Sequence, residues 1–245
     1  MTNQNQNQTN EFTLKINLNH LRAVATAMCT PKQDQMRTYL HGVHVTTLHP
    51  AHPDSGQPPY RGYALEATDG HRLMRAVNRD AGAYVREGGE GDKPSFSFLL
   101  PHDAVQTLIK NPLLKKLDFT VVRVSFAGSD EPSASQVTLH LPGGTHSVFS
   151  LPNTTFPDTS RVTPERVPSS ETAAQYNDEY LADMGKAAVA LAPHRVRRDA
   201  KRAYHVHQDG QNAAVVTFDA DENVYGVLMP LRSSEPGPFV RGEFF

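Results

Sequence analysis

The chain has 245 residues, of which 38% are hydrophobic and 20% charged, with 18 prolines and 16 glycines. This composition is typical of a globular protein rich in turns and excludes fibrous and collagen-like proteins. No apolar run reaches the roughly 18 residues that a membrane span needs, and the Asn/Gln-rich start lacks the features of a secretory signal, so we expect a cytoplasmic protein. The single cysteine, Cys29, excludes an internal disulfide and a cysteine-ligated zinc site.

Charge is distributed unevenly along the chain. The formal net charge is −2 at pH 7, which does not favour a generally basic coat for nucleic acid. Between residues 186 and 202, however, six basic residues stand against one acidic residue, so this stretch carries +5 and the rest of the chain −7. The sequence therefore describes an acidic protein with one basic stretch, made of Lys186, Arg195, Arg197, Arg198, Lys201 and Arg202.

A strand, a helix and further strands recur along the chain. Residues 12–16 alternate like a strand, and Asn17 is placed to cap a helix with apolar residues at helical spacing. The same pattern returns at Pro101, after residues 96–100, and at Asn177. Counted from Asn17, Pro101 and Asn177, apolar residues stand at +4 and +7 each time. We therefore expect three similar modules.

Strand-like runs follow each expected helix, and stretches rich in Pro, Gly and Ser separate the runs. This order predicts an α+β fold in which each module contributes a strand, a helix and two or three more strands. The runs are residues 39–48 and 63–77, then 119–126 and 136–151, then 204–206 and 213–229.

Three cations fall on the side of the expected helices away from the apolar stripe, at Arg22, Lys110 and Lys186. Each helix could present a cation to a ligand. An ordinary solvated helix face explains the pattern equally well.

The common local signatures of catalysis and cofactor binding are absent from the sequence. It has no Walker loop, no GxGxxG after a strand, no GxSxG and no HExxH. Gly88-Gly89-Glu-Gly91 is the nearest to a phosphate loop, but it lacks the following Lys and Ser/Thr and is better explained as a flexible turn. We expect no cofactor.

Histidines cluster at His41, His44, His49 and His52, but their spacing does not favour a metal site. His41 and His44 would point to opposite faces of a strand, and the other two lie in a Pro-rich stretch. His205 and His207 share a strand face but lack a third ligand.

The string Ala67-Thr-Asp-Gly-His-Arg-Leu73 is the most unusual in the chain. Its Asp-Gly pair predicts a hairpin turn, and Asp69 with His71 could alternatively form a catalytic pair. Neither a nucleophile nor an oxyanion-stabilising motif accompanies them, so we expect no enzymatic activity.

Five segments of the chain carry a resemblance to a known family. They are Thr38-Tyr-Leu-His-Gly-Val43, Ala67-Thr-Asp-Gly-His-Arg-Leu73, Phe156-Pro-Asp158 with Arg161-Val162, Asn177-Asp-Glu-Tyr-Leu-Ala-Asp183, and Tyr225-Gly-Val-Leu-Met-Pro-Leu-Arg232. Occurring in this order, they resemble the bacterial sliding clamp, the beta subunit of DNA polymerase III. The resemblance implies the DNA-clamp fold, with helices on one face of antiparallel sheets.

The resemblance also implies a domain organisation. One part is similar to the middle domain of the family and another to the second half of its last domain, while the first domain has no counterpart. We expect a disordered tail at 1–11, a two-module domain at 12–156, a linker at 157–171, a half domain at 172–232 and a C-terminal tail at 233–245.

By resemblance, the chain is expected to be a polymerase processivity factor of DNA replication that encircles or contacts duplex DNA. Clamp loaders, polymerases and other proteins with clamp-binding motifs are the implied partners. Four chains of three modules would complete a ring of twelve, so we expect a homo-oligomer. The residues expected to face DNA phosphates without reading bases are Arg22, Lys110, Lys186, Arg195, Arg197, Arg198, Lys201 and Arg202.

The family also has a peptide-binding cleft between its middle and last domains, which receives apolar side chains of partner motifs. The pattern alone would instead make Met229 and Leu231 core strand residues. By resemblance, the cleft residues are Leu40, Thr68, Gly70, His71, Arg72, Leu73, Pro157, Arg161, Val162, Val227, Met229, Pro230, Leu231 and Arg232.

Other interpretations stay open from the sequence. A protein that binds or mimics a host clamp without forming a ring would also retain the cleft, and a hydrolase would use Asp69 and His71. The reduced form suggests a phage or other mobile element as the source. The terminal Phe244 and Phe245 suggest that the tail docks into a clamp cleft.

Overall fold

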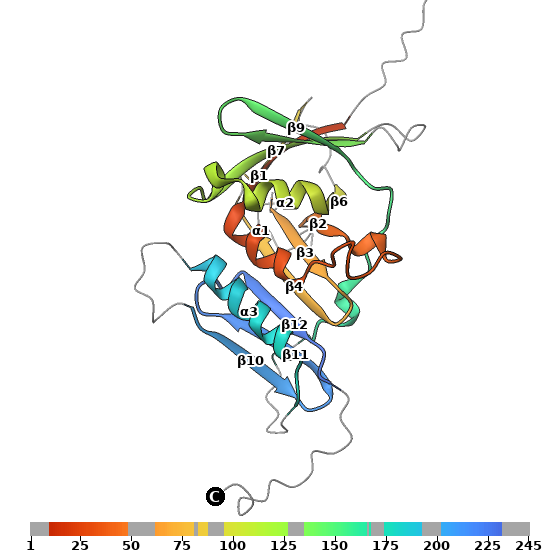
Figure 1. The fold of residues 1–245 in the computed structure, drawn as a ribbon, viewed down its shortest axis with the longest axis vertical. Helices are drawn as coiled ribbons and strands as arrows, with labels where there is room; N and C mark the ends of the chain where they lie inside the picture. The colour runs from red at the N-terminus through yellow and green to blue at the C-terminus, as the bar shows by residue number, and fades with distance from the viewer. Residues whose placement is uncertain are drawn as a thin grey trace, which may run out of the picture.

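The computed structural model describes residues 10–48, 62–80, 83–87, 96–126, 135–165, 167, 174–192 and 202–231. Two antiparallel sheets and three α-helices form this described part, with the helices gathered in one layer (Figure 1). This is the α+β arrangement expected from the sequence.

The first module contains one helix and five strands. They are β1 (Asn10–Asn17), α1 (Leu18–Val24), β2 (Gly42–Thr47), β3 (Tyr63–Thr68), β4 (Arg72–Asn78) and β5 (Tyr84–Glu87), with short 3₁₀ helices η1 (Ala25–Ala27) and η2 (Thr38–Leu40). The second module contains β6 (Ser97–Pro101), α2 (His102–Lys110), η3 (Pro112–Leu114), β7 (Phe119–Phe126), β8 (Gln136–Leu141) and β9 (Thr145–Ser150). After η5 (Thr159–Arg161), the third contains α3 (Asp178–Leu191), β10 (Tyr204–Asp209), β11 (Asn212–Phe218) and β12 (Val224–Leu228).

The three α-helices begin where the sequence predicts. Asn17, Pro101 and Asn177 are their N-cap residues. The side-chain oxygen of Asn17 accepts hydrogen bonds from the backbone N–H of Asn19 and His20, and that of Asn177 accepts one from Glu179. These bonds satisfy amides that have no partner within the helix.

The third module differs from the expected order at its start. Residues 174–177, which precede α3, form no strand. The backbone N–H of Ala174 donates to the side chain of Gln208, and the carbonyl of Gln175 accepts one hydrogen bond from Leu231. A single backbone bond does not make a strand ladder, so the described residues directly before α3 form no leading strand.

The sheets exchange strands between the first two modules. β1 pairs with β7 in a five-stranded sheet of order β5-β1-β7-β8-β9, and β6 pairs with β2 in a seven-stranded sheet of order β10-β11-β12-β4-β3-β2-β6. The seven-stranded sheet continues into the third module through β4 and β12. This sheet therefore contains strands from before and after the expected linker at 157–171. Strands that are far apart in the sequence lie next to each other in it.

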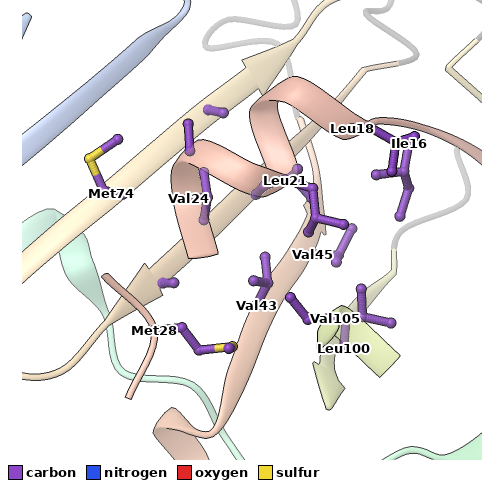
Figure 2. Packing of buried hydrophobic residues seen from close by; sticks show 14 of the residues in the cluster. Ile16, Leu18, Leu21, Val24, Met28, Val43, Val45, Met74, Leu100 and Val105 are labelled. Atoms are coloured by element: carbon purple, nitrogen blue, oxygen red, sulfur yellow. The ribbon is translucent and has the colours of Figure 1, made fainter. Parts of the chain in front are cut away.

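A continuous hydrophobic core lies between the helices and the sheets (Figure 2). Leu21 and Val24 of α1 and Val105 of α2 are fully buried, as their helical spacing predicts. Burial of each such side chain contributes about 1.5–3 kcal/mol. Gly226 of β12 is needed for close packing, because a Cβ there would lie 3.0 Å from the sulfur atoms of both Met74 and Met184.

Within the described part of the chain, no helix is long and apolar enough to cross a lipid bilayer.

Candidate functional site

A cavity of about 230 Å³ opens where the first module, the linker and the end of β12 meet. Its lining is mainly apolar. The lining residues are Arg37, Tyr39, Leu40, Thr68, Gly70, His71, Arg72, Leu73, Pro157, Asp158, Thr159, Val162, Val227 and Met229.

The turn between β3 and β4 forms one wall and is fixed by its own side chains. The Thr68 hydroxyl donates to the carbonyl of Arg72 and accepts from the N–H of Gly70 (2.6 and 3.0 Å). Asp69 Oδ1 accepts from the N–H groups of His71 and Arg72 (2.9 and 3.1 Å). Gly70 has φ +93, where a Cβ would also lie 2.6 Å from Arg37 Nη1. Only glycine fits this turn without strain.

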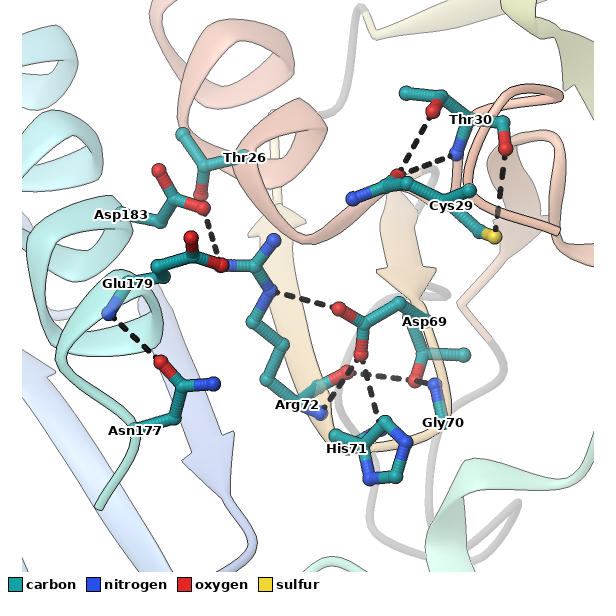
Figure 3. A network of polar contacts seen from close by, with 12 residues as sticks. Thr26, Cys29, Thr30, Asp69, Gly70, His71, Arg72, Asn177, Glu179 and Asp183 are labelled. Carbon is teal, nitrogen blue, oxygen red and sulfur yellow. Dashed lines mark hydrogen bonds and ion pairs between the residues drawn. The ribbon is translucent and has the colours of Figure 1, made fainter.

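Arg72 connects this wall to α3 (Figure 3). Its Nε donates to Asp69 Oδ2 at 3.1 Å, its Nη1 pairs with Asp183 Oδ2, and its guanidinium lies 4.7 Å from the ring centroid of Tyr180. The side chains of Asp69, Arg72 and Asp183 are all largely buried. A buried charge is costly without such partners, so this network holds the two modules in one arrangement.

The segment around η2 supplies the second wall through Arg37, Tyr39 and Leu40. Leu40 is buried, whereas Tyr39 is exposed at the rim. Arg37 Nε donates to Asp34 Oδ2, and this hydrogen bond lowers the pKa of Asp34 to about 2. Asp34 is therefore ionised at neutral pH and holds Arg37 beside Gly70.

The linker supplies the third wall through Pro157, Asp158, Thr159 and Val162. Asp158 Oδ1 accepts from the N–H and hydroxyl of Ser160 (3.1 and 2.7 Å), and the hydrogen bonds with Ser160 lower the pKa of Asp158. This cap starts η5 and fixes the backbone of the wall.

The end of β12 closes the cavity with Val227 and Met229. The N–H of Met229 donates to the carbonyl of His71 at 2.9 Å, which places Met229 beside the β3–β4 turn. Pro230 and Leu231 continue past the cavity and do not line it, and the side chain of Leu231 is 46% exposed. Leu231 is therefore not a core strand residue, and β12 ends before Met229.

Ten of the fourteen expected cleft residues line the cavity, and four other lining residues had not been expected. Arg161 lies on η5 but does not line the cavity, and Arg232 lies outside the described residues. Tyr39 and Asp158 lie within the quoted segments, although neither was expected in the cleft, and Arg37 and Thr159 directly adjoin these segments. Extending each segment by one residue would have included Arg37 and Thr159.

Asp69 and His71 do not form a catalytic pair. The Asp69 carboxylate is occupied by the two backbone amides and by Arg72, while the His71 ring stacks on Tyr180 with centroids 6.2 Å apart. The contacts of Asp69 and those of His71 thus leave no proton path between the two side chains.

The histidines have separate partners. His41 contacts the carbonyl of Asp34, His205 contacts Asp219, and His207 contacts Thr217. Among the residues that the structure describes, no group of three or more His, Cys, Asp or Glu could hold a metal ion. His49 and His52 lie outside those residues.

The helices α2, α1 and α3 lie side by side, with α1 in the middle (Figure 1). Arg22 of α1 is half-buried and donates to Asn19 Oδ1 and to the carbonyl of Leu114 (2.9 and 2.8 Å). Burial lowers the pKa of Arg22, and the negative charge of Asp118 acts in the opposite direction. Lys110 is exposed in the last turn of α2. Lys186 is exposed on α3 and pairs with Asp183 Oδ1 at 2.6 Å.

The three helices together carry three basic and four acidic residues, Arg22, Lys110 and Lys186 against Asp103, Asp178, Glu179 and Asp183. The helix layer alone is thus not a basic surface. Arg202 is exposed just before β10. Arg195, Arg197, Arg198 and Lys201, which supply most of the positive charge of the 186–202 stretch, lie outside the described residues, as does the C-terminal tail.

No protein-family model and no curated protein matches the chain by sequence. Solved structures do match it. The beta sliding clamp of C. crescentus is similar with a TM-score of 0.59 at 17% identity over 95% of this chain and 67% of that chain. The sliding clamp of Bartonella birtlesii, solved with griselimycin bound, gives a TM-score of 0.61 at 18% identity over 95% and 69%.

The beta subunit of DNA polymerase III from Thermotoga maritima matches with a TM-score of 0.56 at 14% identity, over 91% of this chain and 66% of that chain. The chain thus spans about two thirds of the length of these clamps. It has the fold of bacterial sliding clamps, as the resemblance in sequence predicted.

Proposed function

We propose that the chain is a sliding-clamp-like processivity factor that recruits partner proteins through the cavity described above, and that it is not an enzyme. The observation that carries this proposal is the convergence of four separate segments on one apolar cavity, at residues that resemble the clamp cleft. We place its activity in the cytoplasm of a bacterial cell, including one that carries a phage.

The size and chemistry of the cavity favour a peptide ligand. At about 230 Å³ it is smaller than the ~300–1,000 Å³ typical of small-molecule sites. It can receive an apolar side chain while the rest of the peptide lies on the surface. Leu40, Leu73, Val162, Val227 and Met229 would contact that side chain, and the flexible thioether of Met229 would adapt to different anchors.

Duplex DNA would be contacted by the helix layer and the basic stretch that follows α3. Lys110 and Arg202 are exposed, whereas Arg22 and Lys186 already have partners within the protein. A ring that encloses DNA does not require tight binding, because topology retains it. Few and exposed cations would give salt-sensitive contacts without base recognition, which permits sliding.

Assembly into a homo-oligomer would use the open edges of the sheets. Among the described strands, β5, β6, β9 and β10 each have one unpaired edge. Unpaired edge strands offer N–H and C=O groups to another chain, so β9 of one copy could pair with β10 of the next. Four copies would then provide the twelve modules of a ring.

Two measurements test the proposal. Isothermal titration calorimetry with griselimycin, a peptide solved with clamps of Bartonella birtlesii and Pseudomonas aeruginosa, tests the cleft. Light scattering over a concentration series, with and without duplex DNA, tests the ring. A stable tetramer or other closed oligomer would support an encircling clamp. A persistent monomer that binds griselimycin would instead indicate a non-ring protein that competes for clamp partners. Absence of griselimycin binding would count against the cleft.

A further inference from the structure

Glu66 is a buried carboxylate that does not belong to the cavity lining. It lies on β3, and its side chain is only 5% exposed. Tyr63, Leu65 and Ala67 of the same strand join the hydrophobic core, so Glu66 points to the opposite face of the seven-stranded sheet. A charged group at this position requires partners, since an unpaired buried carboxylate is costly.

The partners of Glu66 come from three different segments. Arg75 Nη1 on β4 donates to Oε1 at 2.5 Å, and His44 Nδ1 on β2 lies 3.4 Å from Oε2. The hydroxyl of Thr159, the first residue of η5, donates to Oε1 at 3.1 Å. Burial raises the pKa of Glu66, but His44, Arg75 and Thr159 together lower it below its usual value. The carboxylate is therefore ionised at neutral pH and accepts all three contacts.

Thr159 joins this carboxylate to the cavity. Its side chain lines the cavity, yet the residue is only 7% exposed because its hydroxyl turns towards Glu66. Its carbonyl accepts hydrogen bonds from the N–H groups of Val162 and Thr163, both at 3.2 Å. The hydrogen bond to Glu66 thus fixes the position of Thr159, the residue at which the backbone turn of the linker wall begins.

His44 adds a second attachment of the linker at the same place. Its ring stacks on that of Phe156 with centroids 4.6 Å apart and planes 13° apart, and its Nε2 contacts the hydroxyl of Ser97 at 2.8 Å. Phe156 directly precedes Pro157, the first lining residue of the linker. Glu66 and His44 therefore hold both ends of the segment 156–159 against the sheet.

We infer that Glu66 is a positioning residue for the cleft: it fixes the linker wall through Thr159, so that affinity for an apolar peptide depends on a carboxylate that the peptide does not touch. This inference rests on the proposed function of the cavity. Preorganised walls raise affinity because the ligand does not have to order them on binding.

The test compares Glu66→Gln with Asp221→Asn. Glutamine preserves the shape of the side chain but removes its charge. Asp221→Asn removes the charge of another partly buried pair, His20 Nε2 with Asp221 Oδ2 at 2.7 Å, which does not contact the cavity or the linker. Both variants are expected to be less stable, and only Glu66→Gln should bind griselimycin more weakly, by about three- to tenfold, since a charge-assisted hydrogen bond is lost.

Two further readouts separate positioning from general destabilisation. Amide hydrogen exchange at Val162 and Thr163 should accelerate in Glu66→Gln and not in Asp221→Asn. Thr159→Val removes the same hydrogen bond by deleting its donor. The double variant of Glu66→Gln and Thr159→Val should therefore bind griselimycin about as tightly as whichever single variant binds it less tightly.

Each outcome decides the inference. Unchanged affinity and unchanged exchange in Glu66→Gln would overturn it, as would an equal loss of affinity in Asp221→Asn. If the unmodified protein fails to bind griselimycin, the proposed cleft function fails instead. The exchange measurement then still decides whether Glu66 holds the linker, because it needs no ligand.

Discussion

The cleft and the helix layer use charge in opposite ways. In the cleft, Asp69 and Arg72 are buried and bonded on several sides, and they give the walls a fixed shape. On the helices, Lys110 is exposed and the side chain of Lys186 is 71% exposed. A site that selects a side chain by shape needs rigid walls, whereas contact with a uniform line of phosphates needs mobile charge. Under the proposed function, the same residue types would serve peptide recognition in one region and loose attraction of DNA in the other.

Removal of the buried guanidinium should have the largest effect. Arg72→Ala would leave Asp69 and Asp183 without their shared partner, so we expect the free energy of unfolding to fall by about 3–5 kcal/mol. Urea unfolding followed by circular dichroism measures this. Lys186→Ala is the matched control, because it removes the exposed partner of the same Asp183 and should cost no more than about 1 kcal/mol. Equal losses would mean that burial does not distinguish the two regions.

Shortening the side chain of Met229 should affect peptide binding more than the stability of the fold. Met229 follows β12 and lines the cavity, so Met229→Ala should weaken griselimycin binding about tenfold or more, as expected for an apolar anchor. Calorimetric titration measures the change. Leu231→Ala is the control, since Leu231 is exposed and does not line the cavity. A comparable loss in Leu231→Ala would mean that the cleft extends to the edge implied by the sequence resemblance.

The helix starts could be predicted from sequence because their causes are local. Asn17 and Asn177 bond amides two or three residues ahead, and the apolar spacing of each helix is independent of the rest of the fold. The β3–β4 turn was predictable for the same reason, since Asp69 and Gly70 favour it by their own conformational preferences.

Long-range features could not be predicted in this way. Alternation in residues 12–16 shows which side chains face the core, but it does not say that β1 pairs with β7 and not with β2. The continuation of the sheet from β4 to β12 depends on residues more than a hundred positions apart. Glu66 was missed because an acidic residue in a strand usually indicates an exposed face, and its burial depends on Thr159 of the linker.

Acidification should weaken the junction between the first and third modules. Burial raises the pKa of Asp221, but the hydrogen bond with His20 and those with Asn223 lower it below its usual value. The stabilisation is therefore complete above the unfolded pKa of about 4 and is lost as the pH falls through the lower folded pKa. Urea unfolding between pH 7 and pH 3 should show that the free energy of unfolding depends less steeply on pH in Asp221→Asn than in the unmodified protein. Glu222→Gln, exposed on the same turn, should keep the dependence of the unmodified protein.

Loss of one exposed cation from the helix layer should have the smallest effect. Lys110→Ala would remove one phosphate contact, so the slope of log K against log salt for a short linear duplex should become shallower by about 0.9, with no change in unfolding free energy. Fluorescence anisotropy at several salt concentrations measures the slope. Lys32→Ala is the control, because Lys32 is exposed on the loop before η2 and not on a helix. If both variants reduce the slope equally, DNA is held by diffuse charge and the helix layer is not its preferred surface. If only Lys110→Ala does so, even a helix layer with more acidic than basic residues orients the duplex, because exposure and not net charge decides which cations reach the phosphates.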